Sequence, residues 1–169
     1  DLPIISDTNT LTNQYSYKVF KEFYENNVST FSVLLKSANS LSSDDIKLSE
    51  RLYLPGRKLR GFEAGKVGPK DGNDFIGGNY ISSINATTTI PMILENVQNV
   101  DIVMFADAAN IWGVDYDSSL DKNGIRSSIG VGLDWLTPVG PLTFSFAQPI
   151  TKETTDIEET FRFNIGTSF

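Results

Sequence analysis

The sequence predicts an all-β protein, an antiparallel up-and-down transmembrane β-barrel of about eight strands. The first reason is the alternation of segment 158–169, in which large apolar side chains share one parity and polar side chains mostly take the other. The apolar set of this terminal segment is Phe161, Phe163, Ile165 and Phe169. The second reason is that the connections between the predicted strands are alternately short turns and longer loops, which is typical of outer-membrane barrels. One apolar and one polar face on a strand fit a wall between lipid and a polar interior.

Length and hydropathy agree with this fold class. A chain of 169 residues fits a single barrel domain over 1–169, and it is long enough for eight strands of about ten residues. The chain has no apolar run of about eighteen residues, so no spanning helix is expected. It starts at Asp1 without a basic, apolar signal segment. The sequence is therefore expected to be either a mature chain or a piece cut from a longer one.

Composition argues against several classes of function. Cysteine and histidine are both absent, which removes thiolate chemistry, the commonest metal ligand and the usual general base near neutral pH. The formal net charge of −7 argues against binding to nucleic acid, because such proteins carry basic clusters. We therefore expect no enzyme, no cofactor, no metal and no nucleic-acid partner.

The N-terminal half contains three expected strands, at 15–25, 29–38 and 46–54. Segment 15–25 is rich in aromatic residues but alternates imperfectly, so a helix is also possible there. Its tyrosines fit either a belt at the lipid headgroups or packing within such a helix. The following segment, 55–76, holds five glycines and is expected to be a long inserted loop. Structureless loops of this length are uncommon in compact domains and are usually functional or disordered.

The C-terminal half contains the clearer strands, expected at 78–90, 100–112, 126–136, 141–150 and 158–169. In this phasing Asp107 faces the barrel interior. Small residues also face inward on two of these strands, which suits a narrow lumen. They are Gly130, Gly132, Ser145 and Ala147.

Four sequence blocks, in order from Leu52 to Phe169, resemble the C-terminal barrel of the BamA-type outer-membrane assembly factors, the bacterial surface antigen family. The first block is the loop motif Leu59, Arg60, Gly61 and Phe62. The second is the run 77–79, Gly-Gly-Asn, and the third is 105–109, with Phe105 and Asp107. The fourth runs from Arg126 to the end of the chain. Each block alone is weak, but four in the same order make a specific resemblance.

The resemblance implies a non-enzymatic fragment of an outer-membrane protein insertion factor. Members of this family carry soluble repeats and a barrel of about sixteen strands, of which this chain would supply the C-terminal half. The implied partners are outer-membrane lipid, unfolded outer-membrane protein substrates and subunits of the assembly machinery. Alternatives are a polypeptide-secreting transporter of the same family and a soluble eight-stranded barrel that carries an apolar ligand. The terminal strand also resembles the signal that the assembly machinery reads on its substrates.

The resemblance further implies that the long loop folds into the lumen, where Arg60 pairs with Asp107 beside Phe105. Two departures weaken this expectation: Ala109 stands where glycine is usual, and no glutamate is found near Thr87. Geometry adds a condition, because an eight-stranded barrel has room inside for side chains only. If the chain closes on itself, strand 158–169 pairs with 15–25, the loop lies outside and the Arg60 contact is broken. The other expectation is that two copies of the chain dimerise.

Two cofactor motifs have partial matches in the loops. The run 61–66 is one residue short of a phosphate loop, and the serine or threonine of that motif is missing. The acidic loop 113–124 lacks the glutamate that completes a calcium loop. Ordinary loops are the preferred interpretation of both.

Overall fold

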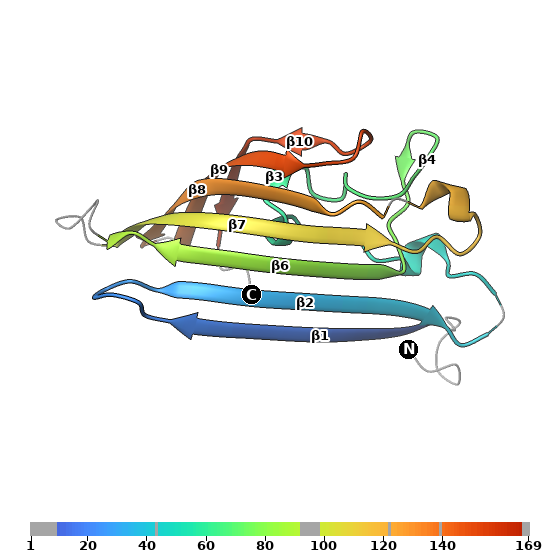
Figure 1. The fold of residues 1–169 in the computed structure, drawn as a ribbon, viewed down its shortest axis with the longest axis horizontal. Coiled ribbons are helices and arrows are strands. Elements are labelled where there is room, and N and C mark those ends of the chain that lie inside the picture. Colours follow the sequence, from blue (N-terminus) through green and yellow to red (C-terminus); the bar gives the residue numbers. More distant parts are fainter. Residues whose placement is uncertain (1–9, 43, 92–98, 122, 139, 167–169) are drawn as a thin grey trace.

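The computed structural model describes residues 10–42, 44–91, 99–121, 123–138 and 140–166. In this part of the chain, seven strands form one antiparallel sheet in the order β1–β2–β6–β7–β8–β9–β11 (Figure 1). The strands are β1 (Thr10–Lys21), β2 (Ser29–Ser40), β6 (Tyr80–Thr89), β7 (Val100–Trp112), β8 (Arg126–Thr137), β9 (Gly140–Thr151) and β11 (Phe161–Ile165). Because strands adjacent in the sheet follow one another in the chain, the sheet is an up-and-down meander. The predicted all-β antiparallel class is confirmed.

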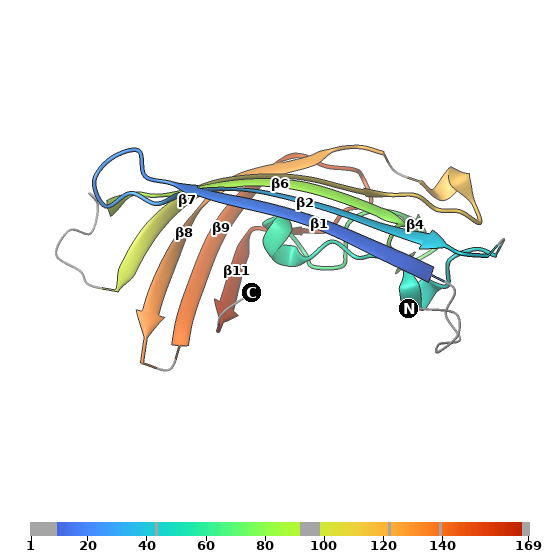
Figure 2. The same ribbon diagram turned by 90° about the horizontal axis from the view of Figure 1, so that it is seen from below.

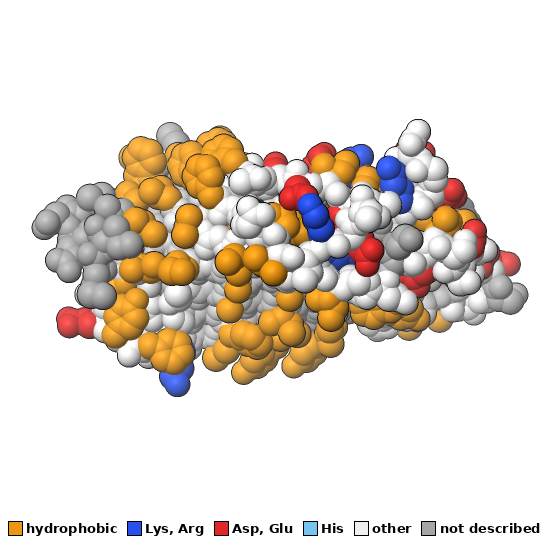
Figure 3. All heavy atoms as spheres, turned by 45° about the horizontal axis from the view of Figure 1, so that its top comes forward, with side chains coloured by type: hydrophobic (Ala, Val, Ile, Leu, Met, Phe, Trp, Pro, Cys, Tyr) orange, Lys and Arg blue, Asp and Glu red, His pale blue; other side chains and the backbone are white. Residues whose placement is uncertain are grey.

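Side chains alternate across this sheet as the sequence predicts. On β7, Val103, Phe105 and Asp107 are buried on the concave face, whereas Met104 on the other face is half exposed. Figure 3 shows apolar side chains gathered over one part of the molecule and charged side chains gathered toward the end where the long loops lie. This division is typical of a wall that meets lipid along its strands and water at its rim.

The sheet is arched, and segment 55–76 lies under the arch, against the concave face (Figure 2). Within this loop, β3 (Gly61–Phe62) pairs with β10 (Glu158–Glu159), and β4 (Lys70–Asp71) pairs with β5 (Asp74–Phe75). The other short elements are the 3₁₀ turns η1 (Leu48–Glu50), η2 (Gly56–Lys58) and η4 (Ser118–Leu120). Of the helices in the described residues, none is long and apolar enough to cross a membrane.

The prediction of a strand at 46–54 is wrong. This segment forms η1 and a single β-bridge between Leu52 and Gly78. Leu54 is buried in the apolar cluster beneath the loop and Leu52 packs against that cluster, so these two leucines serve packing at the rim rather than a strand in lipid. Arg51 pairs with Asp115 and holds the segment across the rim. The sheet therefore has one strand fewer than expected.

The described sheet does not close. Strand β1 pairs only with β2 and β11 pairs only with β9 among the described residues, so the expected pairing of 158–169 with 15–25 is not formed. Closure was the premise for placing the loop outside, and the loop instead lies on the concave face. The alternative of a helix at 15–25 is also wrong, since β1 is a regular strand as far as Lys21.

Candidate functional site

The long loop rests on the wall through an apolar cluster. Leu59 and Phe62 are each 1% exposed, although they belong to a glycine-rich loop. The cluster joins three loop residues and the preceding Leu54 to three wall residues on β6 and β7: Leu59, Phe62, Val67 and Leu54 with Ile81, Ala109 and Ile111. Burying a side chain of this size contributes roughly 1.5–3 kcal/mol, so the cluster helps to hold the loop on the wall. The alanine at position 109 fits within this cluster.

Between the two buried apolar residues of the motif, Arg60 faces the wall and pairs with Asp107. Its Nε lies 2.7 Å from Oδ2 and its Nη2 lies 2.8 Å from Oδ1, so the guanidinium grips the carboxylate through both oxygens. The backbone N–H of Arg60 also donates to Oδ2, at 3.1 Å. The Asp107 side chain is 0% exposed, and that of Arg60 is 18% exposed. Such two-point pairing fixes orientation as well as position.

An aromatic ring and a hydroxyl complete the seat of Arg60. The guanidinium carbon lies 3.5 Å from the centre of the Phe105 ring, which is a close cation–π contact. Nη2 donates to Oγ1 of Thr87 at 3.2 Å. The departure from the family pattern near Thr87 therefore leaves Arg60 with a neutral partner on β6.

Two polar residues that sequence reasoning missed tie the loop backbone to the same site. The Nδ2 group of Asn85 donates to Oδ1 of Asp107 and to the Lys58 carbonyl, both at 2.9 Å. The hydroxyl of Ser128 donates to the Arg60 carbonyl. Asn85, Asp107 and Ser128 lie in register on β6, β7 and β8. Their shared inward parity was visible in the sequence, but their register was not.

A second buried ion pair, also missed, fastens the far part of the loop. Arg126 Nε lies 2.9 Å from Asp156 Oδ2, and both side chains are fully buried. The other oxygen of Asp156 accepts the backbone N–H of Gly68 at 3.2 Å. Arg126 further donates to Oδ1 of Asn110 at 2.8 Å. The loop is thus attached both at its tip, near Asp107, and at the rim, near Asp156.

The rim carries a third ion pair, between Arg51 and Asp115. Burial alone would raise the pKa of Asp115, but the N–H donated by Ile46 and the charge of Arg51 hold that pKa below its ordinary value. Hydrogen bonds from Ser119 lower the pKa of Asp117 in the same way. Since Asp121 accepts the Gly113 N–H, the aspartates of this loop serve its own structure. The described residues contain no group of three or more acidic side chains placed to hold a metal ion.

The apolar residues of the terminal strand lie on the outward face. The Phe161 and Phe163 rings pack against the rings of Phe146 and Phe144, with centroids 4.8 and 4.9 Å apart. Ile165 is 69% exposed, as expected of a side chain that meets lipid. Phe169 lies outside the described residues.

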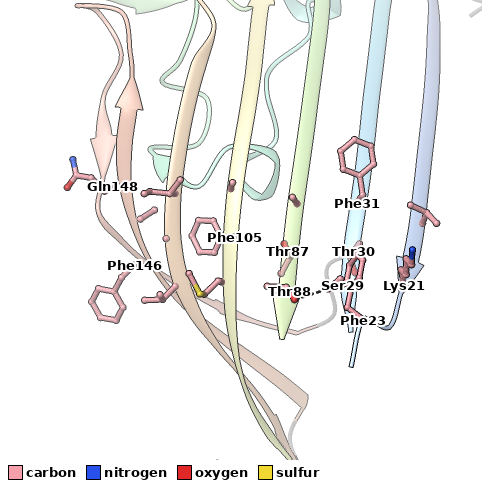
Figure 4. Close-up of a pocket in the computed structure, with 18 of the residues that line it drawn as sticks. Lys21, Phe23, Ser29, Thr30, Phe31, Thr87, Thr88, Phe105, Phe146 and Gln148 are labelled. Atoms are coloured by element: carbon pink, nitrogen blue, oxygen red, sulfur yellow. Dashed lines mark hydrogen bonds between the residues drawn. The ribbon is translucent and has the colours of Figure 1, made fainter. Parts of the chain in front are cut away.

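An apolar hollow of about 1040 Å³ crosses the strands from β1 to β9 (Figure 4). Its lining includes Phe31, Met104 and Phe146, whose parity places them on the face opposite Asp107. Neither Arg60 nor Asp107 borders it. The lining also includes Thr87 and Phe105, both of which contact Arg60, so the hollow adjoins the site around Arg60.

The fold and the site together define a class: a β-barrel wall with a long loop fixed by an arginine to its concave face. Residues 4–169 match the model of the Omp85 superfamily domain. The chain therefore belongs to the Omp85 superfamily, and with it to the membrane β-barrels of the bacterial outer membrane, as predicted.

Individual relatives agree with the family. The chain is 30% identical over 154 residues to "Outer membrane protein assembly factor BamA" of Neisseria meningitidis, a match that covers 74% of this chain and 19% of the relative. It is 28% identical over 150 residues to a "SAM50-like protein" of Schizosaccharomyces pombe, covering 83% of this chain and 31% of that protein. The chain thus spans about a fifth to a third of the length of these curated relatives.

A solved structure also matches. The crystal structure of BamA from Haemophilus ducreyi lacking POTRA domains 1–3 superimposes with a TM-score of 0.86 at 27% identity, over 96% of this chain and 35% of that chain. The open sheet therefore corresponds to part of the barrel in that structure.

Proposed function

We propose that this chain is the C-terminal barrel wall of an outer-membrane protein assembly factor, which folds and inserts unfolded β-barrel proteins into the bacterial outer membrane. The observation that carries the proposal is the loop motif of Leu59, Arg60, Gly61 and Phe62, held on the concave wall by Phe105 and Asp107. It supports a barrel whose lumen contains a fixed internal loop. The names of the relatives favour insertion over polypeptide secretion.

In this proposal the chain acts without chemistry of its own. Strand β11 lies at one edge of the described sheet, and an edge exposes N–H and C=O groups that pair with another strand. A substrate strand that adds to such an edge gains a full set of hydrogen bonds in lipid, where unpaired groups cost several kcal/mol each. The partners are then outer-membrane lipid, unfolded barrel proteins and the other subunits of the machinery. No enzymatic step is required.

The polar concave face argues against the alternative of a soluble carrier. Asp107, Ser128 and Arg126 are buried there, and the loop covers them. The outward face instead exposes phenylalanines and other large apolar side chains. A carrier of apolar ligands needs the opposite arrangement.

The test is reconstitution of the full-length protein that contains this chain into liposomes, with an unfolded outer-membrane barrel protein added outside. Insertion predicts that the substrate becomes protease-protected and runs as a folded, heat-modifiable band faster than with empty liposomes. Delivery of the substrate to the liposome interior would support secretion instead. Equal rates with and without the protein would refute both.

When the chain is produced alone, we expect its two sheet edges to find partners. Strand β1 has an unpaired edge over the described residues, as β11 does. The unpaired backbone N–H and C=O groups of both edges are energetically costly in lipid. A homodimer in detergent satisfies them without the rest of the barrel. Chemical crosslinking checks this expectation, and a strictly monomeric species would contradict it.

A further inference from the structure

The loop is joined by backbone hydrogen bonds to residues 157–159, the segment that leads into β11. Gly61 and Phe62 pair with Glu159 and Glu158, and the ladder continues where Glu63 N donates to Ile157 O at 2.9 Å. Ile157 N in turn donates to Lys66 O at 3.0 Å. The motif that carries Arg60 is therefore also a short strand partner of the segment that leads into β11.

The terminal strand changes its partner within a few residues. Residues 158–159 pair with the loop, whereas β11, from Phe161 onward, pairs with β9 on the wall. Thr160 marks the change, because its carbonyl accepts the N–H of Ala147 on β9. One continuous stretch of chain is thus bonded to the loop at one end and forms the edge of the sheet at the other.

Arg162 closes this junction. Its side chain starts from β11, and its Nη2 donates to the Phe62 carbonyl at 2.5 Å. Its Nε lies 2.7 Å from Oε2 of Glu159, and the side chain is 13% exposed. Close packing at Gly56 completes the contact, since a Cβ there would lie 2.4 Å from Arg162 Nη1. The guanidinium therefore bridges the loop, β10 and β11.

We propose that Arg162 is a positioning residue that couples the loop to the terminal strand, so that the Arg60–Asp107 contact also sets the position of the sheet edge at β11. Arginine suits this role because its planar fork reaches a carbonyl and a carboxylate at once. Glutamine keeps a donor for the carbonyl but loses the ion pair. The coupling is a property of the fold, and only its consequence for insertion rests on the proposed function.

The coupling is tested by hydrogen exchange of backbone amides in the full-length protein in lipid nanodiscs, without substrate. Arg60→Lys loosens the loop at the wall, and the proposal predicts faster exchange both in 57–63 and in 161–165. We expect about tenfold, the effect of losing one charge-assisted hydrogen bond. In the Arg162→Gln background, Arg60→Lys should speed exchange in 57–63 only. Unchanged exchange at 161–165 in the single Arg60→Lys variant would overturn the proposal.

A matched control and a rescue separate coupling from general loosening. Lys152→Gln removes an exposed ion pair with Glu158 on the same segment and should leave exchange in 161–165 at the wild-type rate. A disulfide from Glu63→Cys and Ile157→Cys rejoins loop and segment, and should slow exchange at 161–165 in the Arg162→Gln variant. If the disulfide forms without slowing it, the loop does not position β11. Insertion assays play no part in these readouts, so failure of the proposed function would leave the coupling result standing.

Discussion

Arg60 and Asp107 are 47 residues apart in the sequence and meet through two charged hydrogen bonds, Nε to Oδ2 at 2.7 Å and Nη2 to Oδ1 at 2.8 Å. Each carboxylate oxygen accepts one further hydrogen bond, from the Arg60 N–H and from Asn85. A buried charge that is this fully paired stabilises one arrangement, because removal of either partner leaves the other unsatisfied.

Asn85 provides the first prediction. Asn85→Leu removes the amide that donates to Asp107 and to the Lys58 carbonyl, at nearly constant volume. We expect the free energy of unfolding of the full-length protein to fall by about 2 kcal/mol, because a buried carbonyl loses its donor. Urea titration in lipid vesicles measures the change. The control is Asn13→Leu on the exposed face of β1, and equal effects of the two substitutions would contradict the account.

Gly68 provides the second prediction. Its φ is +108°, and a Cβ there would lie 2.5 Å from Cγ2 of Ile111. Gly65 also has a positive φ, +73°, but has open space around it. Gly65→Ala should cost about 1 kcal/mol of backbone strain, and Gly68→Ala roughly 1–3 kcal/mol more through overpacking. The same urea titration compares the two variants, and a smaller cost at position 68 than at 65 would argue against close packing of the loop on the wall.

The rim ion pair gives a prediction for pH. The pKa of Asp115 in the folded protein lies below its ordinary value of 3.8, so this carboxylate stabilises the fold at higher pH. That stabilisation is lost as the pH falls through the lowered pKa. The free energy of unfolding of wild type should exceed that of Asp115→Asn at pH 6, and the difference should shrink below about pH 4. A difference that stays constant from pH 6 to pH 3 would mean that the Asp115 charge contributes nothing.

Much of the fold could be predicted because strand alternation is a local property. The outward and inward parities of β6 to β9 follow from residues two positions apart, and these strands lie within a few residues of their predicted bounds. Segment 46–54 shows the limit: its leucines alternate as in a strand, but Leu52 and Leu54 pack against the loop and against residues of β6 and β7. Alternation alone cannot show whether the apolar face of a segment is covered by lipid or by a packed loop.

The site divides in the same way. Arg60, Phe105 and Asp107 stand in motifs, so their proximity could be expected from the family resemblance. Asn85 and Ser128 belong to no motif, and only the register of β6 and β8 against β7 brings them to Asp107. The Arg126–Asp156 pair depends on how the loop that carries Asp156 folds against the start of β8, and it had no comparable signal in the sequence.

The central claim is that the Arg60–Asp107 contact fixes the loop for insertion of substrate proteins. Its most direct test compares Arg60→Lys with Arg57→Lys, an exposed neighbour in the same loop. The measurement is the rate of substrate folding into liposomes that contain the full-length protein. Lysine keeps the charge but loses the two-point grip and the stacking on Phe105. The account predicts that Arg60→Lys slows insertion by about tenfold, the equivalent of one charged hydrogen bond, while Arg57→Lys keeps the wild-type rate. Equal rates for the two variants would contradict it.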